Sequence, residues 1–138
     1  MPYPEMLIAP MRQELTRLGV QELRTAQDVE ETLGTGEGTA LLVVNSVCGC
    51  AARNARPAIA MALEGDKRPA RATTVFAGQD VEATARARGL LHGYPPSSPA
   101  IALLKDGDVA FMLERHQIEG RTAQEIAADL RSAFEQHC

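Results

Sequence analysis

The spacing of apolar residues along the chain predicts helices that alternate with strands. Apolar residues recur every three or four positions over residues 5–18, which is typical of an amphipathic helix that ends at Gly19. The unbroken apolar run over residues 40–44 instead indicates a strand, over residues 40–45, that is buried on both faces of a sheet. Capping patterns at Thr25–Asp28 and Thr122–Glu125 predict the starts of two further helices.

Turn and capping residues set the remaining boundaries. Asp106-Gly107 between two apolar runs predicts a hairpin, and Asp80 is placed to cap a helix. Pro57 falls inside a predicted helix and should kink it. We expect helices at 5–18, 26–33, 50–63, 81–88 and from 122 to about 136, and strands at 20–24, 40–45, 73–76, 100–105 and 109–113.

This order predicts an α/β fold in one domain over residues 1–138. The alternating first half implies parallel strands joined by crossover helices, and the hairpin then adds antiparallel strands. A thioredoxin-like domain has this order, with redox cysteines after the second strand and a proline before the fourth. Cys48 and Pro99 occupy those places. We therefore expect a thioredoxin-like domain with a central mixed five-stranded sheet, flanking helices and an extra N-terminal helix.

Composition narrows the classes of function. The chain has 138 residues, a net charge of −4, and 14 basic residues against 18 acidic ones, which does not favour a nucleic-acid partner. The longest apolar runs are too short to span a bilayer, and the N-terminus lacks the pattern of a secretory signal. We therefore expect a cytoplasmic protein without a membrane partner, in a compartment where thiols are kept reduced.

The segment Cys48-Gly49-Cys50 carries the most specific chemistry. Helical positions two apart point to nearly opposite sides, so the two cysteines can meet only if Cys48 lies in the turn before the helix and Cys50 in its first turn. There the free backbone N–H groups and the helix dipole should stabilise the Cys48 thiolate and lower its pKa. A thiolate in this position is a nucleophile.

The same spacing permits a disulfide between the two thiols. A disulfide needs Cα atoms about 4.4–6.8 Å apart. Gly49 has no Cβ and can bend the chain enough to reach that range. Such a small ring should be strained and easily reduced. The other possibility is that Cys48 attacks a mixed disulfide alone, with Cys50 as a resolving thiol.

Three other interpretations of the cysteines remain open. They could be two small core residues, because free cysteine packs as a small hydrophobic side chain. They could bind copper(I) or zinc in a metal carrier, although the further zinc ligands Cys138, His92, His116 and His137 are distant in sequence. The chain could also be a thioredoxin-like binding module with an unreactive Cys48.

Long segments of the chain resemble the bacilliredoxin family. They are VNSVCGCAA at 44–52, NARPA at 54–58, TVFAGQDVEAT at 74–84, GYPPSSPAIAL at 93–103 and RHQIEGR at 115–121. The resemblance implies a thiol–disulfide oxidoreductase that removes bacillithiol from S-bacillithiolated proteins, with Cys48 as nucleophile and Cys50 as auxiliary thiol. Weak disulfide isomerase activity is also implied. Bacillithiol is then a co-substrate, no cofactor is tightly bound, no metal is needed, and a flavoprotein bacillithiol disulfide reductase recycles the small thiol.

The resemblance also suggests residues that contact the substrate. Pro99 is expected to form a cis peptide bond after Ser98 and to lie against the cysteines, so both are candidate substrate-binding residues. Arg56 is a candidate for the malate carboxylates of bacillithiol, since guanidinium groups suit carboxylates, with a solvated helix face as the alternative. Cys138 is expected to be an exposed tail thiol.

Overall fold

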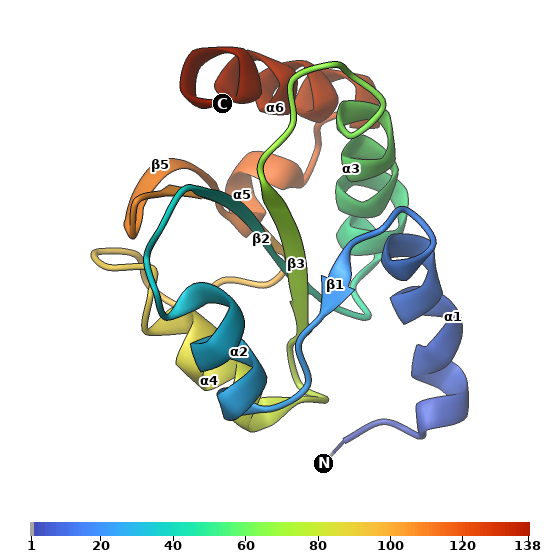
Figure 1. Cartoon of the computed structure of the whole chain (residues 1–138). Helices are drawn as coiled ribbons and strands as arrows, with labels where there is room; N and C mark the ends of the chain where they lie inside the picture. Colours follow the sequence, from blue (N-terminus) through green and yellow to red (C-terminus); the bar gives the residue numbers. More distant parts are fainter. Residues whose placement is uncertain (1) are drawn as a thin grey trace.

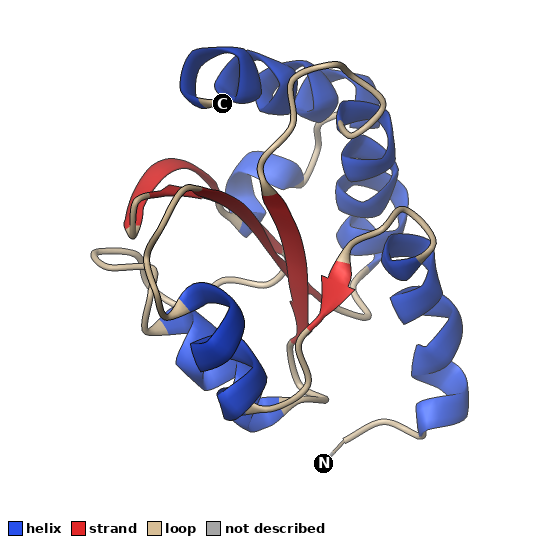
Figure 2. Cartoon of the chain, viewed as in Figure 1, coloured by secondary structure: helices blue, strands red, loops and turns tan. Residues whose placement is uncertain are grey.

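Helices cover both faces of one mixed sheet in the computed structural model, which describes residues 2–138 (Figures 1 and 2). The strands are β1 (Gln21–Glu22), β2 (Thr39–Asn45), β3 (Arg71–Phe76), β4 (Ala100–Lys105) and β5 (Asp108–Leu113). The helices are α1 (Glu5–Thr16), α2 (Ala26–Leu33), α3 (Arg56–Ala62), α4 (Val81–Arg88), α5 (Arg115–Ile118) and α6 (Ala123–His137), with a π-helical segment η1 (Ala51–Ala55) before α3.

The sheet has five strands in the order β1-β3-β2-β4-β5. Strands β1, β3 and β2 are parallel, whereas β4 runs antiparallel to β2 and forms a hairpin with β5. The predicted five-stranded mixed sheet and the extra N-terminal helix are therefore confirmed. The short helix α5 was not predicted, because its one turn is too short to show a helical period.

Alternate residues of β2 enter two separate cores. Leu41 and Val43 pack against α1, α3 and α6, whereas Leu42 and Val44 pack against α2 and α4. Figure 1 shows these two groups of helices on opposite faces of the sheet. Burial of a side chain this size contributes roughly 1.5–3 kcal/mol. The prediction that β2 is buried on both faces is confirmed.

Two of the three predicted helix caps have the expected hydrogen bonds. The side chains of Thr25 and Thr122 accept the N–H groups of Asp28 and Glu125, and each acidic side chain accepts the N–H of its threonine in return. Asp80 precedes α4, but its carboxylate makes no capping hydrogen bond. The predicted cap at Asp80 is therefore wrong, because this carboxylate binds Arg12 instead.

The helix after β2 is irregular just before Pro57. Residues 51–55 form the π-helical segment η1, in which the N–H of Arg56 donates to the carbonyl of Ala51, and regular α-helix follows. Proline has no N–H for the carbonyl four residues earlier and its ring clashes with that group. A π turn gives the freed backbone groups other partners. The predicted irregularity at Pro57 thus takes the form of η1.

Helix α1 is attached to the sheet through a buried arginine. Its buried residues are Ile8, Arg12 and Leu15, while Leu7 is 52% exposed. The guanidinium of Arg12 has a side-chain exposure of 5%, donates to Asp80 at 2.6 Å and binds Glu5 at 2.7 Å. The bond to Asp80 holds α1 beside the loop that follows β3.

We predict that Arg12→Leu destabilises the protein by about 3 kcal/mol, because it leaves the Asp80 carboxylate without its partner in a largely buried position. Urea denaturation followed by circular dichroism measures this change. Arg17→Leu, on the exposed side of the same helical segment, is the matched control and should change stability by less than about 0.5 kcal/mol. Equal stability of the two variants would contradict the role given to Arg12.

The contact between Arg12 and Glu5 depends on pH. The hydrogen bond from Arg12 lowers the pKa of Glu5 below its ordinary value of 4.5. Its stabilising contribution is therefore complete above pH 4.5 and is lost as the pH falls through the lower folded-state pKa. Because Glu5 is about half exposed, we predict that Glu5→Gln costs less than about 1 kcal/mol at pH 7. The difference between the two proteins in urea denaturation should shrink as the pH falls below 4.5; a difference that grows would contradict the assignment.

Candidate active site

Cys48 lies in the turn that joins β2 to the following helix. Its N–H donates to Ser46 Oγ at 3.0 Å, and its carbonyl accepts the N–H groups of Ala51 at 3.0 Å and Ala52 at 3.2 Å. Cys48 thus occupies the position of a helix N-cap residue, where backbone N–H groups are free to meet a side chain. The predicted location of Cys48 before the helix is confirmed.

The sulfur of Cys48 meets both a backbone donor and the second thiol. The N–H of Cys50 donates to Cys48 Sγ at 3.4 Å. The two cysteines are paired as a disulfide with their Cα atoms 5.3 Å apart. Both side chains are half-buried, and Cys48 lines two surface cavities. The interpretation of Cys48 and Cys50 as two small core residues is therefore wrong.

Arg56 lies beneath this turn instead of on the surface. It is 3% exposed, and its Nη1 donates to Asn45 Oδ1 at 2.9 Å and to the Ser46 carbonyl at 3.0 Å. Its Nε lies 3.2 Å from the Glu14 carboxylate. The alternative of a solvated helix face is wrong, because the end of β2 offers acceptors that hold the guanidinium inside. Arg56 lines neither cavity beside Cys48, so we assign it a positioning role in place of the expected ligand contact.

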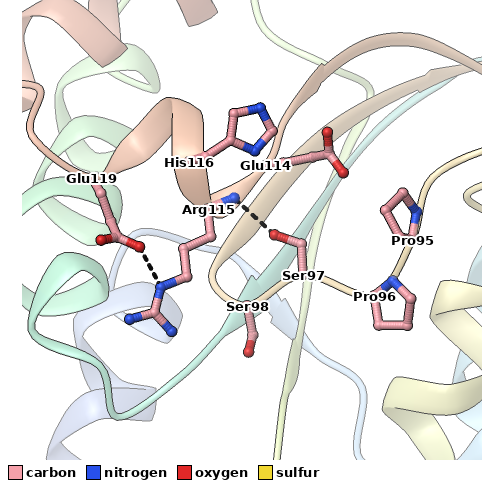
Figure 3. A pocket seen from close by; sticks show the side chains of 8 residues that line it. All are labelled: Pro95, Pro96, Ser97, Ser98, Glu114, Arg115, His116 and Glu119. Atoms are coloured by element: carbon pink, nitrogen blue, oxygen red, sulfur yellow. Dashed lines mark hydrogen bonds and ion pairs between the residues drawn. The ribbon is translucent and has the colours of Figure 1, made fainter.

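The segment before β4 reaches one of the cavities that Cys48 lines. The peptide bond between Ser98 and Pro99 is cis. Pro99 is buried, whereas Ser98 is half-buried and lines a cavity together with Cys48. Ser97 Oγ accepts the N–H of Arg115 at 2.7 Å, which joins this segment to the start of α5 (Figure 3). Contact of Ser98 or Pro99 with a substrate stays a prediction.

Two grooves meet at Cys48. The first, which we call the Tyr3 groove, has a volume of about 390 Å³ and includes Tyr3, Ser46, Cys48, Gly78, Arg88 and Ser98. The second, the Arg53 groove, has a volume of about 320 Å³ and includes Cys48, Gly49, Cys50, Arg53 and Asn54. Arg115 lines both grooves. Cys50 lines only the second, so the two sides of Cys48 are chemically different.

A third groove extends from the same arginine along the segment before β4. It has a volume of about 530 Å³, and Figure 3 shows its side chains. Arg115 Nε donates to Glu119 at 2.5 Å within it, and His116 also lines it. Arg115 therefore stands where all three grooves meet.

Arginines surround the cysteine pair. A side chain at Gly49 would place its Cβ 4.0 Å from Arg53 Nη2, so Arg53 extends over the Cys-Gly-Cys segment. Among residues 2–138, no carboxylate lies within 4.0 Å of Arg53 or Arg88, whereas Arg115 is paired with Glu119. This surface favours a substrate with negative charge.

Sequence reasoning missed Tyr3, Arg88 and the role of Arg115. Arg88 is 40 positions from Cys48, and only the packing of α4 beside β3 brings it to the site. The sequence around Arg88 has no pattern that distinguishes it from a solvated helical arginine. Arg115 is part of the RHQIEGR segment noted above, which could have pointed to it.

The residues considered as further metal ligands do not form a cluster. Within residues 2–138, no three or more His, Cys, Asp or Glu side chains are grouped closely enough to hold a metal ion. Cys138 is half-buried against the core, and its N–H donates to the Phe134 carbonyl at 2.8 Å. The expectation of an exposed tail thiol is wrong, because α6 continues to His137. No helix in the described part of the chain is long and apolar enough to cross a membrane.

Comparison with known proteins agrees with this geometry. Residues 3–138 match the family model described as disulphide isomerase. A bacilliredoxin of Koribacter versatilis is 54% identical over 136 residues, covering 99% of this chain and 94% of the relative. A bacilliredoxin of Salinibacter ruber is 56% identical and covers 100% of this chain and 82% of the relative. A bacilliredoxin of Bacillus licheniformis is 53% identical, with 99% and 95% covered.

The chain belongs to the bacilliredoxin family. Its fold is thioredoxin-like: a thioredoxin of Fasciola hepatica has a TM-score of 0.59 at 21% identity, covering 86% of this chain and 100% of that one. A thioredoxin of Malassezia sympodialis has a TM-score of 0.55 at 15% identity, with 86% and 90% covered. With its paired cysteines at a helix start, this bacilliredoxin-family protein is a thiol–disulfide oxidoreductase.

We predict that Cys48 is the fastest-reacting thiol of the reduced protein. The N–H group that donates to its sulfur should stabilise the thiolate, which is the nucleophile. At pH 7, iodoacetamide should label Cys48 at least about tenfold faster than Cys138, which serves as the internal control. Peptide mapping by mass spectrometry measures both rates in one sample. Equal rates would indicate an unreactive Cys48 and favour a non-enzymatic binding module.

Proposed function

We propose that this protein removes bacillithiol from S-bacillithiolated client proteins in the cytoplasm. The observation that carries the proposal is that Cys48 and Cys50 come within bonding distance at the junction of two surface grooves. The groove arginines would suit an anionic small thiol, and the relatives are bacilliredoxins by name. Bacillithiol is the co-substrate in this proposal, and no tightly bound cofactor takes part.

The reaction consists of two thiol–disulfide exchanges. The Cys48 thiolate attacks the bacillithiol sulfur of the mixed disulfide, so that a Cys48–bacillithiol disulfide forms and the client cysteine leaves as a thiolate. The Cys50 thiolate, or a second bacillithiol, then attacks the adduct. With Cys50, the Cys48–Cys50 disulfide forms and bacillithiol leaves as a thiolate; with a second bacillithiol, Cys48 is released and bacillithiol disulfide forms. Each exchange breaks one disulfide and forms another.

A separate reductant must restore the starting state. The second exchange leaves either a Cys48–Cys50 disulfide or bacillithiol disulfide in place of the mixed disulfide of the client. Either product needs two electrons to be reduced to thiols. We propose that bacillithiol reduces the protein and that a flavoprotein bacillithiol disulfide reductase reduces bacillithiol disulfide in turn. Weak isomerase activity would follow from the same Cys48 thiolate acting on a disulfide between two client cysteines.

We predict different effects of the two active-site cysteines. Cys48→Ser should abolish removal of bacillithiol from a modified client, because serine is not a nucleophile toward disulfides under these conditions. Cys50→Ser should retain the first transfer and accumulate a Cys48–bacillithiol adduct. Intact-mass spectrometry of client and protein in the same sample follows both events.

Cys138→Ser is the matched control, since this thiol lies apart from the cysteine pair in the structure, at the end of α6. It should react as the wild type does. Full removal of bacillithiol by Cys48→Ser, or an adduct on Cys138 instead of Cys48, would contradict the proposed function.

A further inference from the structure

The two grooves at Cys48 are lined by residues from different elements. Arg88 lies at the end of α4, which packs with α2 on one face, whereas Arg53 lies in η1, which continues into α3 on the other face (Figure 1). Both grooves contain Cys48, but only the Arg53 groove contains Cys50. The Cys48 sulfur therefore has a side that faces Cys50 and a side that faces the Tyr3 groove.

Displacement at sulfur makes these sides inequivalent. In a thiol–disulfide exchange the attacking sulfur and the leaving sulfur lie on opposite sides of the sulfur that is attacked, because the new bond forms into the back of the breaking one. When Cys50 attacks the adduct on Cys48, it comes from the Arg53 groove. The small thiol that leaves must then point away from Cys50, toward the Tyr3 groove.

We propose that the Tyr3 groove is the subsite for the anionic small thiol and that Arg88 is its specificity-determining residue. This assignment rests on the proposed function, and it names where the carboxylates of the small thiol are bound. In the exchange with Cys50, the Cys48–Cys50 disulfide forms, the bond from Cys48 to the small thiol breaks, and the small thiol leaves as a thiolate held beside Arg88.

The hydrogen bonding of Arg88 supports this role. Its Nε is buried and has no hydrogen-bond partner among residues 2–138. Its Nη2 makes one long contact of 3.5 Å, to the Ser97 carbonyl. A buried guanidinium nitrogen without an acceptor is costly, and a carboxylate is the acceptor that suits it best. Arg115 lines the same groove but already binds Glu119, which leaves Arg88 as the uncommitted cation.

The far wall of the Tyr3 groove is fixed. The N–H of Tyr3 donates to Gln79 Oε1 at 2.8 Å, and Gln79 Nε2 donates to the Tyr3 carbonyl at 3.0 Å. Gly78 has a φ of +78°, which disfavours any side chain there. A Cβ at Gly78 would also lie 3.8 Å from the Tyr3 ring. The groove thus keeps free space between Tyr3 and Cys48, because Gly78 has no side chain to fill it.

The experiment compares three adducts on one client peptide: bacillithiol, mercaptosuccinate with two carboxylates, and neutral 2-mercaptoethanol. Arg88→Gln should lower kcat/KM about tenfold for the two anionic adducts, which is the effect of one lost charge-assisted hydrogen bond, and less than about twofold for the neutral adduct. Arg88→Lys should recover part of the loss, and similar thermal midpoints would show that all variants fold.

Two further variants separate the possible outcomes. Arg86→Gln, on the same helix but paired with Glu30, is the control and should match the wild type on all adducts. Arg53→Gln tests the other side: a charge-selective loss there and not in Arg88→Gln would place the small thiol in the Arg53 groove and overturn the assignment. Equal losses of Arg88→Gln on all three adducts would also overturn it while the proposed function stands. A wild-type protein that leaves every adduct intact would contradict both.

Discussion

The buried guanidinium of Arg56 holds the end of β2 in place, and the geometry of the site depends on it. Arg56 donates to Asn45, the last residue of β2, and to the carbonyl of Ser46, which follows it. Asn45 Oδ1 also accepts the N–H of Ser46, and Ser46 Oγ accepts the N–H of Cys48. This chain of hydrogen bonds runs from the helix interior to the reactive cysteine. A buried charge with several partners has few alternative arrangements, which restricts the conformations open to the turn.

The π-helical segment η1 belongs to the same arrangement. Pro57 follows Arg56 directly, and its missing N–H leaves the preceding turn without a regular hydrogen bond. Because that turn widens, Arg56 still has its N–H bonded, to the Ala51 carbonyl, while its side chain reaches back under the strand end. Pro57, which interrupts the helix, and Arg56, which fixes the end of the strand, are thus adjacent residues that both shape the turn that holds Cys48.

The sequence was sufficient to predict the parts of this structure that depend on local patterns. The buried run of β2, the capping boxes at Thr25 and Thr122, the Asp106-Gly107 hairpin and the cysteines at a helix start each have a short-range physical cause. Two of the failures involve long-range partners. Asp80 had the pattern of a cap, but a carboxylate binds a buried guanidinium more strongly than backbone N–H groups, and Arg12 lies 68 positions away. Arg56 was misplaced for the same reason, since its acceptors belong to another element.

The topology explains why one site draws residues from so many places. The helix after β2 packs on one face of the sheet and the helix after β3 packs on the other, so a crevice opens outside the carboxyl ends of these two parallel strands. Ser46 and Cys48 follow β2, and Ala77 and Gly78 follow β3, and all four line the Tyr3 groove. Ser98, which lies just before β4, lines the same groove. In the exchange that forms the Cys48–Cys50 disulfide, the attacking sulfur and the leaving sulfur lie on opposite sides of the Cys48 sulfur. A crevice where the chain diverges to both faces of a sheet offers a separate groove for each of them.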